Sequence, residues 1–176
     1  AIALSASSEG EIIALNSTRK LPVPTQNVNG EWLAPIVGIL SEFGVKSHFD
    51  SATKSLTLDS SDGRTAVLTV GKSELVTGAS KLKLNAPPAL DQGNILLPVS
   101  AVARWLGLSF QLTEKGDIEL NHGVLDLNVR ESGEKFVVEV HNSGPTQYTY
   151  GRLSEPDRLY VDIKQADLLV TERNLT

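Results

Sequence analysis

The chain of 176 residues contains no cysteine and no methionine, and only 5% of its residues are aromatic. Without cysteine, the chain has no disulfide bond, no cysteine-ligated zinc site and no thiol nucleophile. The avoidance of cysteine also agrees with an oxidising envelope compartment, where an unpaired thiol would be a hazard. Because the chain has no initiator methionine, we interpret it as an excised segment.

Basic clusters and long apolar runs are also missing. The net charge is −5, and the lysine and arginine residues are scattered along the chain. A protein that binds nucleic acid needs a basic stripe to neutralise phosphates, so we expect no nucleic-acid partner. The chain has no run of 18 apolar residues, and residues 1–8 lack the pattern of an intact signal peptide. We therefore expect no transmembrane segment.

What the sequence does contain is an internal repeat with an offset of 63 residues. The segment 30–45 returns without a gap as the segment 93–108. Three pairs of turn-forming residues coincide: Gly30 with Gly93, Pro35 with Pro98, and Gly44 with Gly107. A repeat of this kind indicates that one structural unit occurs twice.

Each copy predicts a strand, a helix and a hairpin. Proline suits the first position of a helix and glycine the position just after its end, so we expect helices over 35–43 and 98–106. Apolar residues recur between these limits at the spacing of a helix that packs on a core: Ile36, Ile39, Leu40, Phe43, Val99, Val102, Ala103 and Leu106. Alternating apolar and polar residues then predict hairpins over 45–58 and 108–120.

Downstream of His122 the sequence changes character. The helical spacing disappears, and alternating residues predict three strands at 124–130, 136–141 and 158–163. Glycine, proline and asparagine residues mark the turns between them. This part of the chain is therefore predicted to be all-β.

Together these patterns predict an α+β fold for a first module, residues 1–122. Its duplicated strand-helix-hairpin units, at about 11–58 and 74–120, would pack their helices on an antiparallel sheet. A small all-β module over residues 123–176 would follow. Trp105 lies off the apolar stripe of its helix, and we expect it either to be an exposed contact residue or to be covered by the neighbouring module.

The repeat also carries a recognisable phrase. The phrase is an Asn-Gly or similar turn, a strand that ends near a proline, a short helix that ends in Leu-Gly, and a strand-turn-strand unit. It runs from Asn29-Gly30 to Phe43-Gly44 and again from Gln92-Gly93 to Leu106-Gly107. In this respect the duplicated part, roughly residues 11–121, resembles the copper amine oxidase N-terminal-like domain, also called a stalk domain. The resemblance implies an accessory domain without copper chemistry.

In the second module, the run from Tyr150 to Ile163 contains the core Pro-x-Arg-Leu-x-x-Asp. This phrase is similar to one in the AMIN domain, a small β module that precedes cell-wall amidases and pilus secretins in bacterial envelopes. Such a domain would need further strands after Ile163, whereas the sequence stops at Thr176. We therefore expect residues 123–176 to form a truncated AMIN-like domain, and leave open whether another chain completes it.

The second module also supplies the candidate ligand-binding residues. On the strand 158–163, alternate side chains would project away from the apolar face and form a polar strip with the neighbouring segment. The strip comprises Tyr148, Tyr150, Arg152, Arg158, Tyr160 and Asp162. Aromatic rings stack on sugars and arginine pairs with carboxylates, so we predict that the strip binds a glycan. The alternative is that Arg158 and Asp162 form bonds within the module that hold the strand and its preceding turn.

No constellation in the sequence supports catalysis. His48, His122 and His141 lack metal-ligand spacing, and we interpret them as polar or edge-strand positions. No serine lies in a Gly-x-Ser-x-Gly elbow, and no glycine-rich phosphate loop is present. We therefore predict that this segment is not an enzyme and has no catalytic residue, metal or cofactor.

The two resemblances imply the non-catalytic N-terminal part of an exported bacterial envelope protein, in the periplasm or outside the cell. Its partners would be peptidoglycan or another envelope polysaccharide, with other envelope proteins as further partners. It would position a C-terminal effector, with an N-acetylmuramoyl-L-alanine amidase as the first candidate and a phosphodiester glycosidase-like domain as the second. The opposing hypothesis is a protein–protein interaction module in a secretin or surface assembly.

Overall fold

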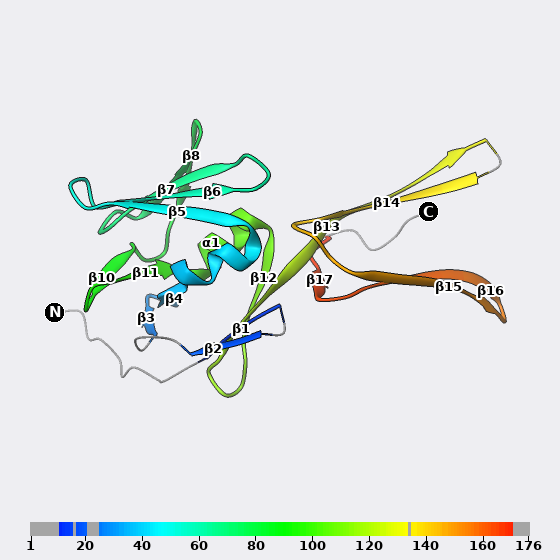
Figure 1. Cartoon of the computed structure of the whole chain (residues 1–176), viewed down its shortest axis with the longest axis horizontal. Helices are drawn as coiled ribbons and strands as arrows, with labels where there is room; N and C mark the ends of the chain where they lie inside the picture. The colour runs from blue at the N-terminus through cyan, green and yellow to red at the C-terminus, as the bar shows by residue number, and fades with distance from the viewer. Residues whose placement is uncertain (1–10, 16, 21–24, 134, 171–176) are drawn as a thin grey trace.

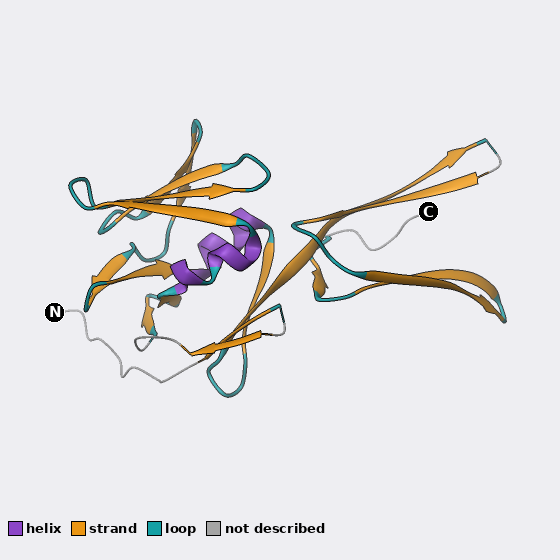
Figure 2. Cartoon of the chain, viewed as in Figure 1, coloured by secondary structure: helices purple, strands orange, loops and turns teal. Residues whose placement is uncertain are grey.

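The structure, a computed structural model, describes residues 11–15, 17–20, 25–133 and 135–170. About 60% of these residues lie in strands and 10% in helices. The predicted α+β fold with helices packed on a sheet is therefore wrong, because the described chain is mostly β and has a single α-helix. Figures 1 and 2 show short helical segments among the strands of a larger body, from which two ribbons project. None of the described helices has the length and hydropathy needed to cross a membrane.

The two copies of the repeat meet in a four-stranded antiparallel sheet of order β10-β11-β4-β3. Its strands are β3 (Gln26–Val28), β4 (Glu31–Ala34), β10 (Ala89–Asp91) and β11 (Asn94–Pro98). Ala34 on β4 lies directly opposite Leu97 on β11. These two residues hold the same position in the two copies, so antiparallel pairing relates the copies by a local two-fold axis at this pair.

The helical segments of the two copies differ. The first copy forms two 3₁₀ helices, η1 (Ile36–Gly38) and η2 (Leu40–Phe43), whereas the second forms one α-helix, α1 (Val99–Leu106). Gly38 and its β-branched neighbours disfavour an α-helix, and the second copy has Ala101 at the position of Gly38. The helix predicted over 35–43 is therefore present as two 3₁₀ helices, and not as an α-helix like that of the second copy.

Both segments end at the predicted glycine and bury the predicted apolar stripe. Gly44 and Gly107 adopt left-handed conformations with φ of 72° and 71°. Ile39 and Val102, which hold equivalent positions, are 8% and 1% exposed and belong to the same core. The two helical segments therefore contribute to one hydrophobic core.

Two larger sheets complete the body. The first is a meander of β5 (Val45–Asp50), β6 (Ser55–Ser60), β7 (Thr65–Thr69), β8 (Glu74–Thr77) and β9 (Ser80–Lys83). The second has the order β12-β13-β1-β2, with β14 and β17 also paired to β13. Its strands are β1 (Glu11–Ala14), β2 (Ser17–Lys20), β12 (Leu108–Leu112), β13 (Ile118–Ser132), β14 (Lys135–Asn142) and β17 (Ala166–Leu168). The two predicted hairpins are confirmed as β5–β6 and β12–β13.

The long strand β13 continues out of the body into the first ribbon. It pairs with β12 at its start and with β14 towards its end. The second ribbon consists of β15 (Tyr148–Ser154) and β16 (Asp157–Ile163), paired antiparallel. The predicted boundary between residues 122 and 123 falls within β13, and the division into two modules stays a prediction.

Candidate binding surfaces on the C-terminal ribbons

The β15–β16 ribbon carries all six residues predicted to bind a ligand. Its register sets Tyr150 opposite Val161, and Leu153 opposite Arg158. Because residues in direct register project to the same side of a sheet, the ribbon has two distinct faces. The inner face, which looks toward β14, carries Tyr148, Tyr150, Arg152, Leu159, Val161 and Ile163. The outer face carries Thr149, Gly151, Leu153, Arg158, Tyr160 and Asp162.

This register divides the polar strip expected from the sequence. Three of its residues lie on the inner face: Tyr148, Tyr150 and Arg152. The other three lie on the outer face: Arg158, Tyr160 and Asp162. A ligand seated on one face therefore contacts at most three of the six, and their role in binding stays a prediction.

On the inner face, Tyr148 and Tyr150 form a stacked aromatic pair. Their ring centroids are 6.5 Å apart, and the residues are 65% and 76% exposed. Arg152 continues the row and donates two hydrogen bonds of 2.5 Å to the carboxylate of Asp157. These bonds lower the pKa of Asp157 and raise the pKa of Arg152. The inner face thus presents aromatic and aliphatic surface, with its charges paired near the tip.

On the outer face, Arg158 and Asp162 flank Tyr160. Within the described part of the chain, neither charged side chain forms a hydrogen bond or an ion pair. The Tyr160 ring lies over Gly151, where an added Cβ would be 2.7 Å from the tyrosine oxygen. Alternate residues of a strand are roughly 7 Å apart. The outer face therefore offers a cation, a phenol and a carboxylate in one row.

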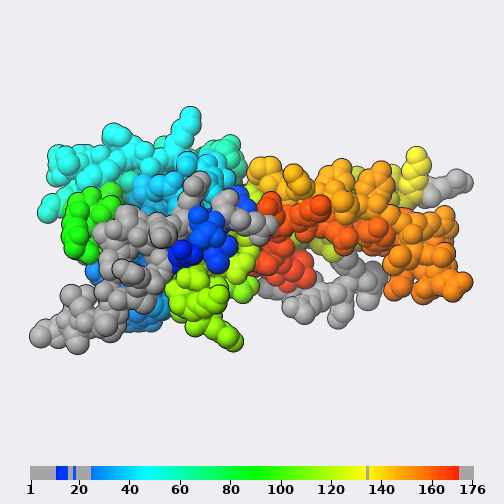
Figure 3. All heavy atoms as spheres, turned by 60° about the horizontal axis from the view of Figure 1, so that its bottom comes forward, coloured from blue at the N-terminus to red at the C-terminus, as the bar shows by residue number. Residues whose placement is uncertain are grey.

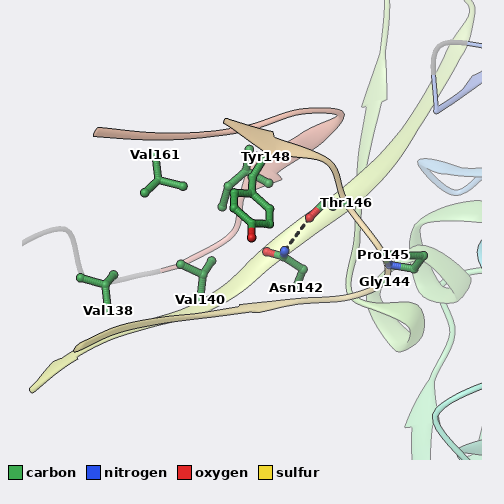
Figure 4. A pocket seen from close by; sticks show the side chains of 9 residues that line it. Val138, Val140, Asn142, Gly144, Pro145, Thr146, Tyr148 and Val161 are labelled. Atoms are coloured by element: carbon green, nitrogen blue, oxygen red, sulfur yellow. Dashed lines mark hydrogen bonds between the residues drawn. The ribbon is translucent and has the colours of Figure 1, made fainter. Parts of the chain in front are cut away.

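A groove lies between β14 and the inner face (Figure 4). It has a volume of about 570 Å³ and is lined by Val138, Val140, Asn142, Gly144, Pro145, Thr146, Tyr148, Val161 and Ile163. Asn142 Nδ2 donates to Thr146 Oγ1 at 2.7 Å, and Asn142 Oδ1 is buried without a partner among the described residues. Exposure rises along β16, from the half-buried Ile163 to 51% at Val161 and 83% at Leu159. The groove is therefore closed at its base and open toward the ribbon tips.

His122 lies at the base of the ribbons, where β13 leaves the body. It is 3% exposed, and its ring meets Phe43 edge-on at a centroid distance of 5.5 Å. Ser143 Oγ lies 3.2 Å from His122 Nδ1 and accepts the N–H of Gly123 at 2.9 Å. Gly144 packs against the imidazole so closely that an added Cβ would lie 2.2 Å from it. This burial lowers the pKa of His122.

Sequence reasoning missed the role of His122 at this joint. The residue sits in the interior of a sheet, between β12 and β17, and not at an edge. The available signal was Gly144, beside Ser143, because a side chain at this position would meet the imidazole ring. His48 and His141 are exposed, and in the described ranges no three His, Cys, Asp or Glu side chains gather as metal ligands.

Trp105 is covered by Arg64, which lies between the two copies of the repeat in the sequence. Arg64, between β6 and β7, lies 5.7 Å from the centre of the Trp105 ring and donates a hydrogen bond to the Trp105 carbonyl. Asp62 pairs with Arg64 at 2.6 Å, which lowers the pKa of Asp62 to about 2. Trp105 is only 8% exposed, so the expected exposed contact residue is wrong and its cover comes from within the body.

Figure 3 shows the body and the ribbons as two adjoining masses of atoms along the length of the molecule. The sequence model of the copper amine oxidase N-terminal domain matches residues 14–118, which form most of the body. All of β13 after Ile118, together with β14, β17 and the β15–β16 ribbon, lies beyond the match. No curated protein and no solved structure matches the chain.

Proposed function

Because the chain belongs to the copper amine oxidase N-terminal domain family, we propose that it is a spacer and targeting region of a bacterial envelope protein. The match confirms the resemblance seen in the repeat, and the matched part is a non-catalytic accessory domain. The AMIN-like nature of the tail, the envelope location and the polysaccharide ligand belong to the proposal.

The observation that carries the spacer role is the continuity of β13. This single strand pairs within the body at Ile118 and with β14 at Ser132. At about 3.3 Å per residue, its 15 residues extend roughly 50 Å. A continuous hydrogen-bonded strand couples the ribbon to the body and holds it away from the core. Such a geometry suits a domain that sets a distance between a ligand and an effector.

We assign polysaccharide binding to the outer face of the β15–β16 ribbon. Tyr160 offers an aromatic ring to a sugar, and Arg158 offers a guanidinium to the carboxylates of peptidoglycan. Asp162 adds an acceptor for sugar hydroxyls. Neither charge is used within the described chain, which favours a ligand role over the alternative of an internal support. Tyr148, Tyr150 and Arg152 lie on the inner face and are not part of this row.

The effector proposed from the resemblance of the tail is an N-acetylmuramoyl-L-alanine amidase, with a phosphodiester glycosidase-like domain as the second candidate. The alternative function is a protein–protein interaction module of a secretin or surface assembly. The exposed apolar surface of the inner face supports an interaction with protein as well.

Co-sedimentation of the chain with purified sacculi tests the polysaccharide role. We expect weak binding by the parent chain and loss of binding in Arg158→Ala, because the guanidinium on the outer face is removed. Arg152→Ala is the matched control, since it removes the same charge from the inner face of the same ribbon and should bind as the parent does. Equal binding by all three chains, at unchanged melting temperature, contradicts the assignment.

A further inference from the structure

We propose that a second copy of this chain covers the apolar surface formed by β14 and the inner face of the β15–β16 ribbon, on the two walls of the groove, giving a two-fold symmetric dimer. The contact goes beyond the spacer and polysaccharide-binding roles, because it uses the face opposite to the row of Arg158, Tyr160 and Asp162. The outer face remains open to a ligand in such a dimer.

The first observation is a continuous apolar surface on the two sides of the groove. Its six members are each more than half exposed: Phe136, Val138, Tyr148, Tyr150, Leu159 and Val161. Together they expose roughly 700 Å², taking about 150–250 Å² for a whole aromatic side chain. The largest apolar patch on an ordinary monomer covers about 300–600 Å². A stable interface needs about 800 Å² per partner, so this surface approaches what a dimer requires.

The second observation is that the β15–β16 ribbon has no third strand in the described structure. β15 pairs only with β16 among the described strands. A two-stranded ribbon by itself is marginally stable in water. The base of the ribbon, near Ile163, lines the groove and is partly buried there. Leu159, toward the tip of the ribbon, is 83% exposed. Within the described ranges, the outer half of the ribbon therefore lacks an apolar surface to pack on.

The shape and charge of the inner face favour a second copy over another partner. A two-fold contact joins the same patch on both subunits, so the patch must complement itself. An apolar surface meets this condition, because apolar side chains of one copy can pack against the same apolar side chains of another. The charge of Arg152 on this face is already paired with Asp157 at 2.5 Å. Among the described residues, the inner face of the β15–β16 ribbon thus has no unpaired charge to select an oppositely charged partner or to repel its own copy, and Glu131, opposite Phe136, lies at the tip of the other ribbon.

Sedimentation equilibrium of the full chain, from about 1 to 200 µM, tests the dimer. The mean mass should rise from the 18.9 kDa of one chain toward twice that value. Leu159→Glu should weaken the dimer by at least about tenfold, because it places a charge within the contact. Leu153→Glu is the matched control on the outer face of the same ribbon, where the leucine is 45% exposed, and should dimerise as the parent does.

Disulfide trapping gives a readout that does not depend on a destabilising charge. The chain has no cysteine, so a single Leu159→Cys variant can cross-link only to another copy. Mild oxidation should convert Leu159→Cys to a covalent dimer faster than Leu153→Cys. A chain that stays at the mass of one copy at the highest concentration overturns the proposal and leaves the face to a different protein. Leu159 and Leu153 variants that behave alike in both assays overturn it as well.

Discussion

Glu31 of the first copy supports the start of the α-helix in the second copy through Ser100. The Glu31 carboxylate accepts the Ser100 N–H at 3.1 Å and the Ser100 hydroxyl at 2.6 Å, and Glu31 is only 3% exposed. It satisfies one of the N–H groups that have no partner inside a helix. Asn94 holds the position of Glu31 in the second copy and, within the described residues, forms no bond to the helical segment of the first copy.

Glu31→Ala should lower the free energy of unfolding by about 2 kcal/mol, because it leaves the N–H and hydroxyl of Ser100 without their acceptor. Glu31→Gln is the control, since its amide can still accept from the N–H and donate to the hydroxyl. Urea unfolding monitored by circular dichroism measures the free energy of unfolding of both variants. Equal losses in the two variants would show that the charge of Glu31, and not its hydrogen bonds, supports the helix.

Gly38→Ala should raise the free energy of unfolding by about 0.4–1 kcal/mol. Gly38 has a negative φ and nothing within 4 Å of an added Cβ, so alanine reduces the entropy of the unfolded chain without strain. Thermal unfolding detects the change as a higher Tm. A lower Tm would mean that the 3₁₀ geometry of the first copy depends on glycine here.

Stability should fall as the pH drops below about 6.5, the ordinary pKa of histidine. Burial depresses the pKa of His122 in the folded chain, so the unfolded chain binds its proton at a higher pH. Protonation therefore favours unfolding, and the contribution is fully present above the unfolded pKa. Urea unfolding at about pH 7.5 and about pH 5 measures the difference in the free energy of unfolding, because these values lie about one unit or more on either side of 6.5.

The dependence of the free energy of unfolding on pH should shrink in His122→Gln and persist in His141→Gln. His141 is exposed, so its substitution serves as the control for the removal of a histidine. If both variants keep the parent's dependence between these pH values, the titrating group lies elsewhere.

Gly144→Ala should destabilise the joint at the base of the ribbons by about 1–3 kcal/mol, the usual cost of overpacking. The added methyl group would lie 2.2 Å from the His122 ring, and Gly144 does not have a positive φ, so the effect is steric. Amide hydrogen exchange should locate the loss of protection at His122 and Ser143. Unchanged protection there would show that the ring moves freely to accept the methyl group.

Much of the body could be predicted from the sequence because its signals are local. The positions of Gly44 and Gly107, the buried pair Ile39 and Val102, and the hairpins all follow from spacing within one copy. The helix expected in the first copy forms as two 3₁₀ helices, and its spacing did not reveal this difference from the second copy. A long-range contact helps to explain the difference, because the Glu31 carboxylate accepts hydrogen bonds from Ser100 at the start of α1. Among the described residues, the helical segment of the first copy has no equivalent acceptor, and it contains Gly38.

The sequence alone determined which residues share a face of each strand, since alternation in a strand has a period of two. Only the tertiary structure decided how those faces meet. It set Ala34 opposite Leu97, and it turned Arg158 away from Arg152 by pairing Leu153 with Arg158. A shift of register by one residue exchanges the two faces of a strand, and the register depends on turns and packing across the chain. The alternation within a single strand carries no information about that choice.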